Sequence, residues 1–466
     1  MLFSSIPFLY YFLPIVLILY FVVPSKLKNT VLLVSSLFFY AWGEPKYVFL
    51  MITTIIVGFV LGILIEKYRG NIKSKIFMIL SVVICIGFLG YFKYADFFID
   101  NFNKVTGLQV PLLRLALPIG ISFYTFQILS YTLDVFMGNV KAQRNPFTLG
   151  AYITMFPQLI AGPIVRYSDI EAQLQERTHS IDKSAEGITR FTIGLGKKIL
   201  IANTLGEICT IFASSDDKSI LFYWIYAIAF SMQIYFDFSG YSDMAIGLGK
   251  ILGFDFLENF NYPFISRSIS EFWRRWHMSL GYWFRDYVYI PMGGSRVSNK
   301  RYLLNVFTVW FLTGFWHGAS WNFIIWGLYF ALFLIIEKFF IGKFLKDHMV
   351  LSHIYVIFFV IISFVIFNAT NLSDVFTYVG GMFGIGNVPF ISDETVYYLR
   401  SYLFVIIAGI IGATPYPKNI ILKLKKNNQY NKILNIAEII VVIGLIIIVT
   451  AFLVDGSFNP FLYFRF

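Results

Sequence analysis

The feature that most constrains this chain is a series of long apolar runs, which recur from its N-terminus to its C-terminus. The runs extend over roughly 17–25 residues, the length at which an α-helix crosses the hydrocarbon core of a bilayer. Their clearest cores are Thr30–Ala41, Val48–Ile65, Ile76–Tyr91, Leu112–Phe136, Ile220–Ile234, Leu303–Phe315, Phe323–Ile336, Ile354–Phe367, Tyr398–Ala413 and Ile433–Leu453. A membrane-spanning chain forms either helices or a closed barrel of strands with alternating apolar residues. Because no such alternation is present, we predict an all-α polytopic membrane protein.

The composition agrees with a chain that lies almost wholly in a membrane. Of the 466 residues, 58% are hydrophobic and 14% are charged, whereas soluble domains carry about 25% charged residues. We expect roughly 11–14 membrane-inserted segments, a range that reflects apolar runs that are short or broken by proline. The N-terminal run lacks the basic region and cleavage site of a signal peptide, so we expect a first span there.

We expect one domain over residues 1–466, because no stretch is suited to fold alone as a soluble domain. Residues 1–111 carry few charges within their apolar runs and are the expected scaffold spans. Residues 112–341 contain most of the polar residues that interrupt apolar sequence, so they are the expected functional core. Residues 342–466 are expected to add C-terminal spans.

The basic residues predict the orientation of the spans. A formal net charge of +11 can indicate a nucleic-acid partner, but in a membrane chain it more often reflects cytoplasmic loops rich in Lys and Arg. Three stretches have this character: Lys67–Lys75, Arg296–Arg301 and Lys418–Lys432. We place all three in the cytoplasm and expect no nucleic-acid partner. The acidic stretch Ser373–Glu394 then lies outside, as does the C-terminus.

Polar residues interrupt the apolar sequence first in the run Leu117–Gly138. Such residues usually face the interior of a helix bundle, where they find hydrogen-bond partners. Pro157 and Pro163 follow and are expected to break a helix; broken backbone at membrane depth must be buried in protein or line a cavity. Ser168–Ser184 is highly charged and is expected to form an interfacial helix, on which His179 is simply exposed.

Two carboxylates, Asp237 and Asp243, lie in apolar sequence beside Ser239. A buried carboxylate must be paired or protonated. Two interpretations remain open: the aspartates are structural partners of arginines or backbone groups, or they line a reaction chamber.

His277 lies in the stretch that begins at Ser270, a candidate helix cap. On the predicted helix, four residues recur at helical spacing and share one side: Trp273, His277, Leu280 and Phe284. Arginines flank this stripe. An amphipathic helix at the membrane interface also explains the pattern, so His277 is equally compatible with a structural and a functional role.

His317 lies in a second Trp-rich stretch and is the stronger candidate. Ionisable groups in membrane spans are costly and are by default functional hypotheses. Small residues surround it and are expected to leave space for a substrate beside the ring: Gly314, Gly318, Ala319 and Ser320. Tryptophans are expected to form the walls: Trp310, Trp316, Trp321 and Trp326.

Proton transfer is the chemistry that suits this histidine. A desolvated imidazole stays neutral near pH 7 and can take a proton from an alcohol as the alcohol attacks an acyl carbon. The sequence contains no serine-hydrolase nucleophile elbow, P-loop, dinucleotide-binding loop or metal-spaced His/Cys cluster. We therefore expect no metal and no bound cofactor.

Two motifs resemble the signature segments of the membrane-bound O-acyltransferase family. They are WHxSLxxWFRDYVYIPxGG at Trp276–Gly294 and FWHGASWNFIxWG at Phe315–Gly327. Further similar segments are Leu117–Gln127, Phe156–Tyr167, Phe236–Gly247 and the ending Asn459–Phe466. The length and the ending are most similar to the branch that includes the alginate O-acetylation protein, and the D-alanyl transferases of teichoic acid are near relatives.

The resemblance implies a ring of membrane helices around a thinned core with a tunnel. It implies that a cytoplasmic thioester, acetyl-CoA or an acyl-carrier protein, donates an acyl group that reaches an acceptor outside. His317 would be the catalytic histidine and His277 its partner. The remaining expected tunnel residues are Asp237, Ser239, Asp243, Trp273, Arg274, Trp276, Trp316, Ser320, Trp321 and Asn322. The expected partners are an envelope polysaccharide, an extracytoplasmic acetyltransferase and the lipid bilayer of a bacterial plasma membrane.

Two other functions remain open at this point. One is D-alanyl transfer to teichoic acid from a carrier protein. The other, from a different class, is a proton-coupled transporter or flippase in which the histidines relay protons with Asp237 and Asp243. The absence of a two-fold internal repeat counts against the transporter.

Overall fold

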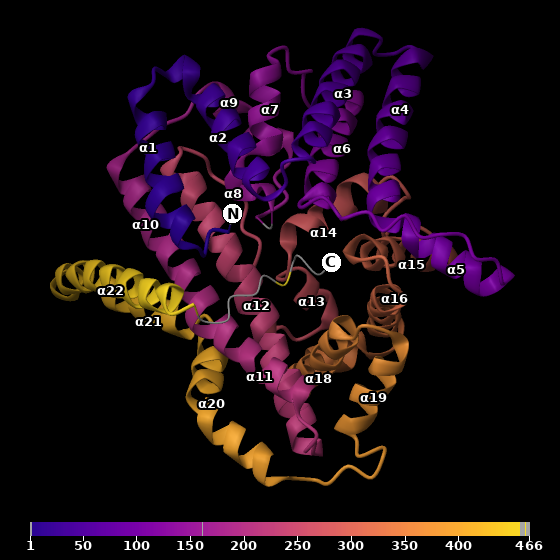
Figure 1. Ribbon diagram of the computed structural model, residues 1–466, viewed down its shortest axis with the longest axis vertical. Helices are drawn as coiled ribbons and strands as arrows, with labels where there is room; N and C mark the ends of the chain where they lie inside the picture. Colours follow the sequence, from indigo (N-terminus) through magenta and orange to yellow (C-terminus); the bar gives the residue numbers. More distant parts are fainter. Residues whose placement is uncertain (1, 161, 457–461, 463–466) are drawn as a thin grey trace. The chain divides into compact units, whose positions relative to one another are not determined.

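The computed structural model describes residues 2–160, 162–456 and 462 (Figure 1). Every regular element in that part of the chain is a helix. The chain divides into two compact units: Met1–Phe191 with Met244–Leu257, and Thr192–Asp243 with Glu258–Phe466. The predicted all-α class is confirmed.

Seven helical segments among the described residues are long and apolar enough to cross a membrane. They are Val48–Lys67, Ile72–Thr106, Ile220–Ile251, Trp321–Asp347, Met349–Asn368, Asp393–Gly412 and Tyr430–Val454. Phe8–Val22 is a shorter apolar helix at the position of the predicted first span. The chain is therefore a multi-pass membrane protein, and the larger number of inserted segments stays a prediction.

The first unit contains the N-terminal helices. They are α1 (Leu13–Val22), α2 (Lys28–Gly43), α3 (Val48–Lys67), α4 (Ile72–Leu89), α5 (Ala95–Thr106), α6 (Ile121–Met137), α7 (Pro146–Thr154), α8 (Phe156–Leu159) and α9 (Tyr167–Gln175). The unit also includes most of α10 (Ile181–Gly196). Helices α3, α4 and α6 pack side by side (Figure 1). Gly62 allows α3 to approach α6, because a Cβ there would overlap the Tyr131 ring.

The polar residues of α6 face the interior, as predicted: Tyr124, Thr125, Gln127, Ser130, Tyr131 and Asp134 are all buried. The prediction that an apolar helix begins near Leu112 is wrong. Residues 107–118 are not helical, and Pro118 and Gly120 precede the first turn of α6. Gly120 has a φ of +73°, a left-handed conformation that glycine adopts without a steric penalty.

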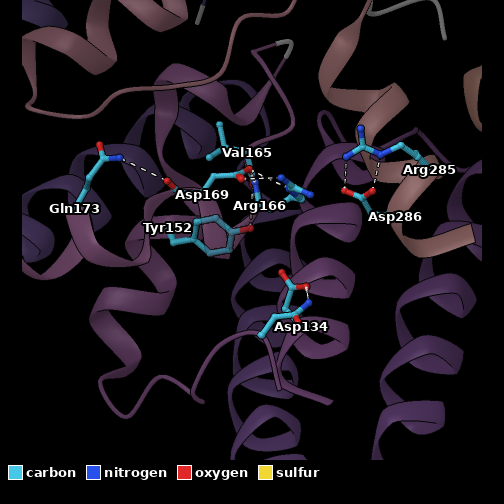
Figure 2. Close-up of polar contacts among 9 residues, drawn as sticks. Asp134, Tyr152, Val165, Arg166, Asp169, Gln173, Arg285 and Asp286 are labelled. Carbon is cyan, nitrogen blue, oxygen red and sulfur yellow. Dashed lines mark hydrogen bonds and ion pairs between the residues drawn. The ribbon is translucent and has the colours of Figure 1, made fainter. Parts of the chain in front are cut away.

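The predicted break at Pro157 and Pro163 is confirmed, because only the short α8 lies between α7 and α9. Figure 2 shows how the broken backbone is held. The Tyr152 hydroxyl donates to the Val165 carbonyl at 3.0 Å, and the Asp169 carboxylate accepts from the backbone N–H and the guanidinium of Arg166. The single helix predicted at Ser168–Ser184 is wrong: α9 ends at Gln175 and α10 begins at Ile181.

The second unit contains the remaining helices. They are α11 (Thr204–Ser214), most of α12 (Ile220–Ile251), α13 (Ile269–Trp273), α14 (Met278–Phe284), α15 (Asn299–His317), α16 (Trp321–Ile336), α17 (Gly342–Asp347), α18 (Met349–Asn368), α19 (Leu372–Met382), α20 (Asp393–Gly412), α21 (Tyr416–Lys425) and α22 (Asn428–Val454). Helices α21 and α22 pack against each other (Figure 1).

Helices α15 and α16 pack against each other, and two glycines allow their backbones to approach closely. A Cβ on Gly314 would overlap the Phe323 carbonyl and lie 3.3 Å from the Cα of Gly327. A Cβ on Gly327 would overlap the Trp310 carbonyl and lie 3.1 Å from the Gly314 nitrogen. Backbone atoms cannot swing aside as a flexible side chain can, so both positions require glycine.

Gly314→Ala is therefore expected to push α15 and α16 apart and to lower the free energy of unfolding by about 1–3 kcal/mol, the usual cost of overpacking. Gly444→Ala on α22 is the matched control, because a Cβ at that position meets nothing within 4 Å. We expect the control to be neutral or slightly stabilising, since alanine favours helices over glycine. Thermal unfolding in detergent measures both variants; equal melting temperatures for the two would contradict the prediction.

Candidate active site

His317 is the last residue of α15, and its imidazole lies among three aromatic rings. The ring centroids of Trp316, Trp326 and Phe367 lie 5.0, 5.0 and 5.3 Å from it. All three contacts are edge-to-face. The side chain is buried, with 8% of its surface exposed. The helix ends here because Gly318 adopts an extended backbone.

A small cavity of about 20 Å³ lies beside the His317 ring. Its walls are Ile234, Phe238, Trp276, Trp326, Phe364 and Phe367. A space of this size holds a group about as large as one water molecule. The small residues do not create it, contrary to the prediction: the missing side chains of Gly314 and Gly318 make room for the backbone and ring of Phe323.

His277 lies between two short helices rather than inside one. It precedes α14 with φ +45° and ψ 51°, a left-handed conformation that is unusual for a residue with a side chain. The single helix predicted from Ser270 is therefore wrong. Ser268, not Ser270, caps α13, and the Ser270 hydroxyl donates to Glu337 at 2.6 Å. Backbone strain of this kind is often found at functional sites.

The hydrogen bonds around His277 fix its tautomer. Asn259 Oδ1 accepts from the backbone N–H of Ser279 at 3.3 Å and from its hydroxyl at 2.9 Å, so this atom is the amide oxygen. His277 Nδ1 lies 3.1 Å from the same oxygen and must carry a hydrogen to bond to it. The lone pair of Nε2 is then available, and no described residue donates to it. Burial lowers the pKa of His277 to about 3, so the ring is neutral at physiological pH.

A larger cavity of about 250 Å³ lies beside His277. All four residues of the predicted stripe line it: Trp273, His277, Leu280 and Phe284. Other walls come from Arg285, Tyr289, Tyr302, Val309, Trp310 and Thr313. The helix is broken, but the prediction that these four residues share one side is confirmed.

Two tryptophans connect the histidines. The Trp316 ring centroid lies 6.1 Å from that of His277 and 5.0 Å from that of His317. Trp276 lines both the 250 Å³ cavity and the small cavity beside His317. The two histidines therefore belong to one site within the second unit.

A third cavity, of about 460 Å³, has walls from α11, α12 and α19 and from Asn368 at the end of α18. Gln233 and Asn368 line it, and their chain neighbours Ile234 and Phe367 line the small cavity. Its other polar walls are Thr210, Tyr226, Thr370, Asp374 and Tyr378. None of these residues is among the predicted site residues. Gln233 and Asn368 were visible as single amides at the ends of the runs Ile220–Ile234 and Ile354–Phe367.

Both aspartates pair with lysines, whereas the structural interpretation had named arginines or backbone groups as their partners. Asp237 and Lys198 are both buried, and the Lys198 Nζ lies 2.6 Å from the Asp237 carboxylate. That carboxylate also accepts from the backbone N–H of Leu462 at 3.2 Å. Asp243 pairs with Lys197 at 2.7 Å. Neither aspartate lines any of the three cavities, so their structural interpretation is favoured.

The other predicted tunnel residues lie around this site without lining the cavities. Ser239 is buried, Arg274 is exposed, Ser320 precedes α16, and Trp321 is 49% exposed rather than part of a wall. Asn322 has a clear positioning role. Its amide donates to the carbonyl of Phe367 at 3.2 Å and to that of Ala369 at 2.8 Å, at the end of α18. Of the predicted C-terminal motif, residues 459–461 and 463–466 lie outside the described residues.

Comparisons with known proteins show which proteins this chain is similar to. The chain is 37% identical over 499 aligned residues to a protein of Azotobacter vinelandii named "Probable alginate O-acetylase AlgI", with 100% of both chains covered. It is 33% identical to the peptidoglycan O-acetyltransferase of Helicobacter pylori, over 83% of this chain and 81% of that one. It is 31% identical to the teichoic acid D-alanyltransferase of Bacillus subtilis, over 58% and 76% of the two chains.

The matching family model covers residues 139–377, which include both histidines and most of the walls of the three cavities. Its description is the membrane-bound O-acyltransferase family. The apolar helices and the relatives of full length agree with that assignment. The chain belongs to the membrane-bound O-acyltransferase family and is a multi-pass membrane acyltransferase.

Proposed function

We propose that this enzyme moves an acetyl group from a cytoplasmic thioester, across the plasma membrane of a bacterium, for O-acetylation of an envelope or extracellular polysaccharide. One observation carries the proposal: the small cavity at the His317 ring shares Trp276 with the 250 Å³ cavity, and its walls Ile234 and Phe367 are chain neighbours of residues that line the 460 Å³ cavity. A group transferred at His317 can thus be supplied from one cavity and received in the other.

The 250 Å³ cavity suits the donor. Its walls are mostly aromatic and aliphatic, which fits an acyl thioester. Arg285 also lines it and is paired with Asp286 at 2.6 Å (Figure 2). Tyr289 and Tyr302 line it and flank the basic stretch Arg296–Arg301 in the sequence, which the positive charges place in the cytoplasm. Acetyl-CoA and an acyl-carrier protein are both compatible donors.

The 460 Å³ cavity suits a hydroxylated acceptor. It presents the amides of Gln233 and Asn368, the hydroxyl of Tyr226 and the carboxylate of Asp374. Asp374 begins the acidic stretch that the charge pattern places outside the cell. The names of two relatives, which refer to alginate and to peptidoglycan, support an envelope polymer as the final acceptor. A separate extracytoplasmic acetyltransferase would complete the transfer to that polymer.

His317 would act as the general base in this reaction. It takes the proton of the acceptor hydroxyl as the hydroxyl oxygen bonds to the thioester carbonyl carbon. The carbon–sulfur bond then breaks, and the proton passes from the imidazole to the leaving thiolate. His277, neutral and with a free Nε2 lone pair, lies on the donor side. It would accept a hydrogen bond there rather than contribute a positive charge.

Blocking the donor cavity tests this proposal. Val309→Trp places an indole in the 250 Å³ cavity and is expected to lower acetyl transfer from labelled acetyl-CoA at least tenfold in proteoliposomes. Phe307→Trp is the matched control, because Phe307 is on the same helix and is 50% exposed. Equal activity of both variants would exclude this cavity as the donor site. A D-alanyl-loaded carrier protein, supplied in parallel, distinguishes acetyl from D-alanyl transfer.

A further inference from the structure

Three basic side chains of the first unit converge on one buried tyrosine at the end of α1. Lys28 Nζ lies 4.8 Å from the centroid of the Tyr20 ring, and Arg177 Cζ lies 5.7 Å from the same centroid. The His179 ring centroid also lies 5.7 Å from it. His179 is exposed, as predicted, and it also belongs to this basic cluster of Lys28, Arg177 and His179.

No carboxylate balances the cluster. Neither Lys28 nor Arg177 forms an ion pair with any acidic residue in the described part of the chain. Arg177 donates to Asn29 Oδ1 at 2.7 Å through Nη2, while its Nη1 has no partner among the described residues. The nearby Lys183 is already paired with Asp255 at 2.7 Å. The cluster therefore carries unmatched positive charge.

His179 keeps one nitrogen free for a ligand. The Tyr20 hydroxyl donates its hydrogen to the Leu252 carbonyl at 2.6 Å, so it can only accept from His179 Nε2, which lies 3.1 Å away. His179 Nδ1 is then the nitrogen that gains or loses a proton. Burial, together with the charges of Lys28 and Arg177, lowers the pKa of His179. A bound anion would oppose that shift.

An exposed apolar face leads to the cluster. Four residues of α1 recur at helical spacing and are 50–79% exposed: Ile15, Ile18, Leu19 and Val22. Phe21, 47% exposed, lies next to the basic groups, with Lys28 Nζ 5.5 Å from its ring centroid. In a membrane protein such a face contacts acyl chains, and the basic groups lie where the apolar helix ends. The basic groups and the apolar face therefore match the two parts of a phospholipid, the anionic headgroup and the acyl chains beside it.

We propose that Lys28, Arg177 and His179 bind the phosphate of an anionic phospholipid whose acyl chains lie along α1. Unmatched positive charge favours an anionic lipid such as phosphatidylglycerol over a zwitterionic one, whose own cation would be repelled. The apolar face favours a lipid over a soluble phosphate, since a soluble anion gains nothing from Ile18 or Val22. The distribution of Lys and Arg predicts that the cluster lies on the cytoplasmic side of the membrane, where anionic lipids attract basic residues.

Lipid titration of the full-length protein in detergent tests this proposal, with binding followed by native mass spectrometry. Phosphatidylglycerol is expected to bind at least tenfold more tightly than phosphatidylcholine. Lys28→Gln and His179→Gln are each expected to lose most of that preference. Arg177→Gln is less suitable, because Arg177 also holds Asn29 in place. Lys46→Gln removes an equal charge from an exposed residue outside the cluster and should retain the full preference.

Three results would each overturn the proposal. The first is equal affinity for the two lipids in the parent protein. The second is an equal preference in Lys28→Gln and Lys46→Gln. The third is competition by inorganic phosphate at concentrations similar to those of phosphatidylglycerol, which would assign the cluster to a soluble anion. Acetyl transfer is a separate readout, because none of these residues belongs to the active site. A failure here is thus distinguishable from a failure of the proposed function.

Discussion

His317→Ala is expected to reduce acyl transfer by a factor of about 10²–10⁴, the usual contribution of a general base. Among the residues that the structure describes, the imidazole is the only ionisable group that lines the small cavity. Without it, no side chain at that cavity can take the acceptor proton. Labelled acetyl transfer by the purified protein in proteoliposomes measures the effect.

The comparison must separate chemistry from folding. His348→Ala is the matched control, because His348 is exposed and stacks on Phe344, away from the three cavities. Both variants are expected to accumulate in the membrane at the level of the parent protein. In size-exclusion chromatography, both are expected to elute at the same volume as the parent. Full activity of His317→Ala at a normal protein level would remove His317 from the mechanism.

Lys198→Met is expected to lower the free energy of unfolding by about 3–5 kcal/mol, the typical cost of leaving one member of a buried ion pair alone. Lys198 and Asp237 are each 2% exposed and lie 2.6 Å apart. The substitution removes the cation and leaves the Asp237 carboxylate buried, with the Leu462 N–H as its remaining described donor. Thermal or denaturant unfolding in detergent measures the loss.

A second substitution tests the cause. Lys198→Met combined with Asp237→Asn leaves no charge in the pair and keeps an oxygen for the Leu462 N–H, so most of the lost stability should return. Lys104→Met breaks an exposed ion pair with Asp100 and is expected to cost at most about 1 kcal/mol. If the double variant is no more stable than Lys198→Met alone, an unpaired charge is not the reason for the loss.

The membrane class could be predicted because it depends on local composition. A run such as Val48–Ile65 is apolar along its whole length, and the structure forms α3 there. The shared side of Trp273, His277, Leu280 and Phe284 could also be predicted from spacing. The break at His277 could not, because neither glycine nor proline occupies that position, and a left-handed histidine depends on its tertiary contacts with Asn259 and Phe238.

Ion pairs and hydrogen bonds between residues far apart in the sequence could not be predicted either. Nothing near Asp237 identifies Lys198 as its partner, and nothing near Asn322 indicates that its amide holds the end of α18. The glycines show the same limit. The sequence predicts that Gly314 leaves room for a substrate, whereas in the structure it leaves room for the backbone of α16. A small residue permits another group to approach closely, but the sequence does not show whether that group is a substrate or a neighbouring helix.

The small cavity beside His317 has a consequence for the choice of acyl group. At about 20 Å³, with Trp326 and Phe367 as its walls, it accepts a methyl group and has no room for a fatty chain. Asn322 holds the Phe367 carbonyl, so that wall does not retreat easily. We therefore expect the enzyme to select its donor by acyl chain length. The aromatic walls would exclude longer acyl groups sterically, whatever the affinity of the protein for their thioesters.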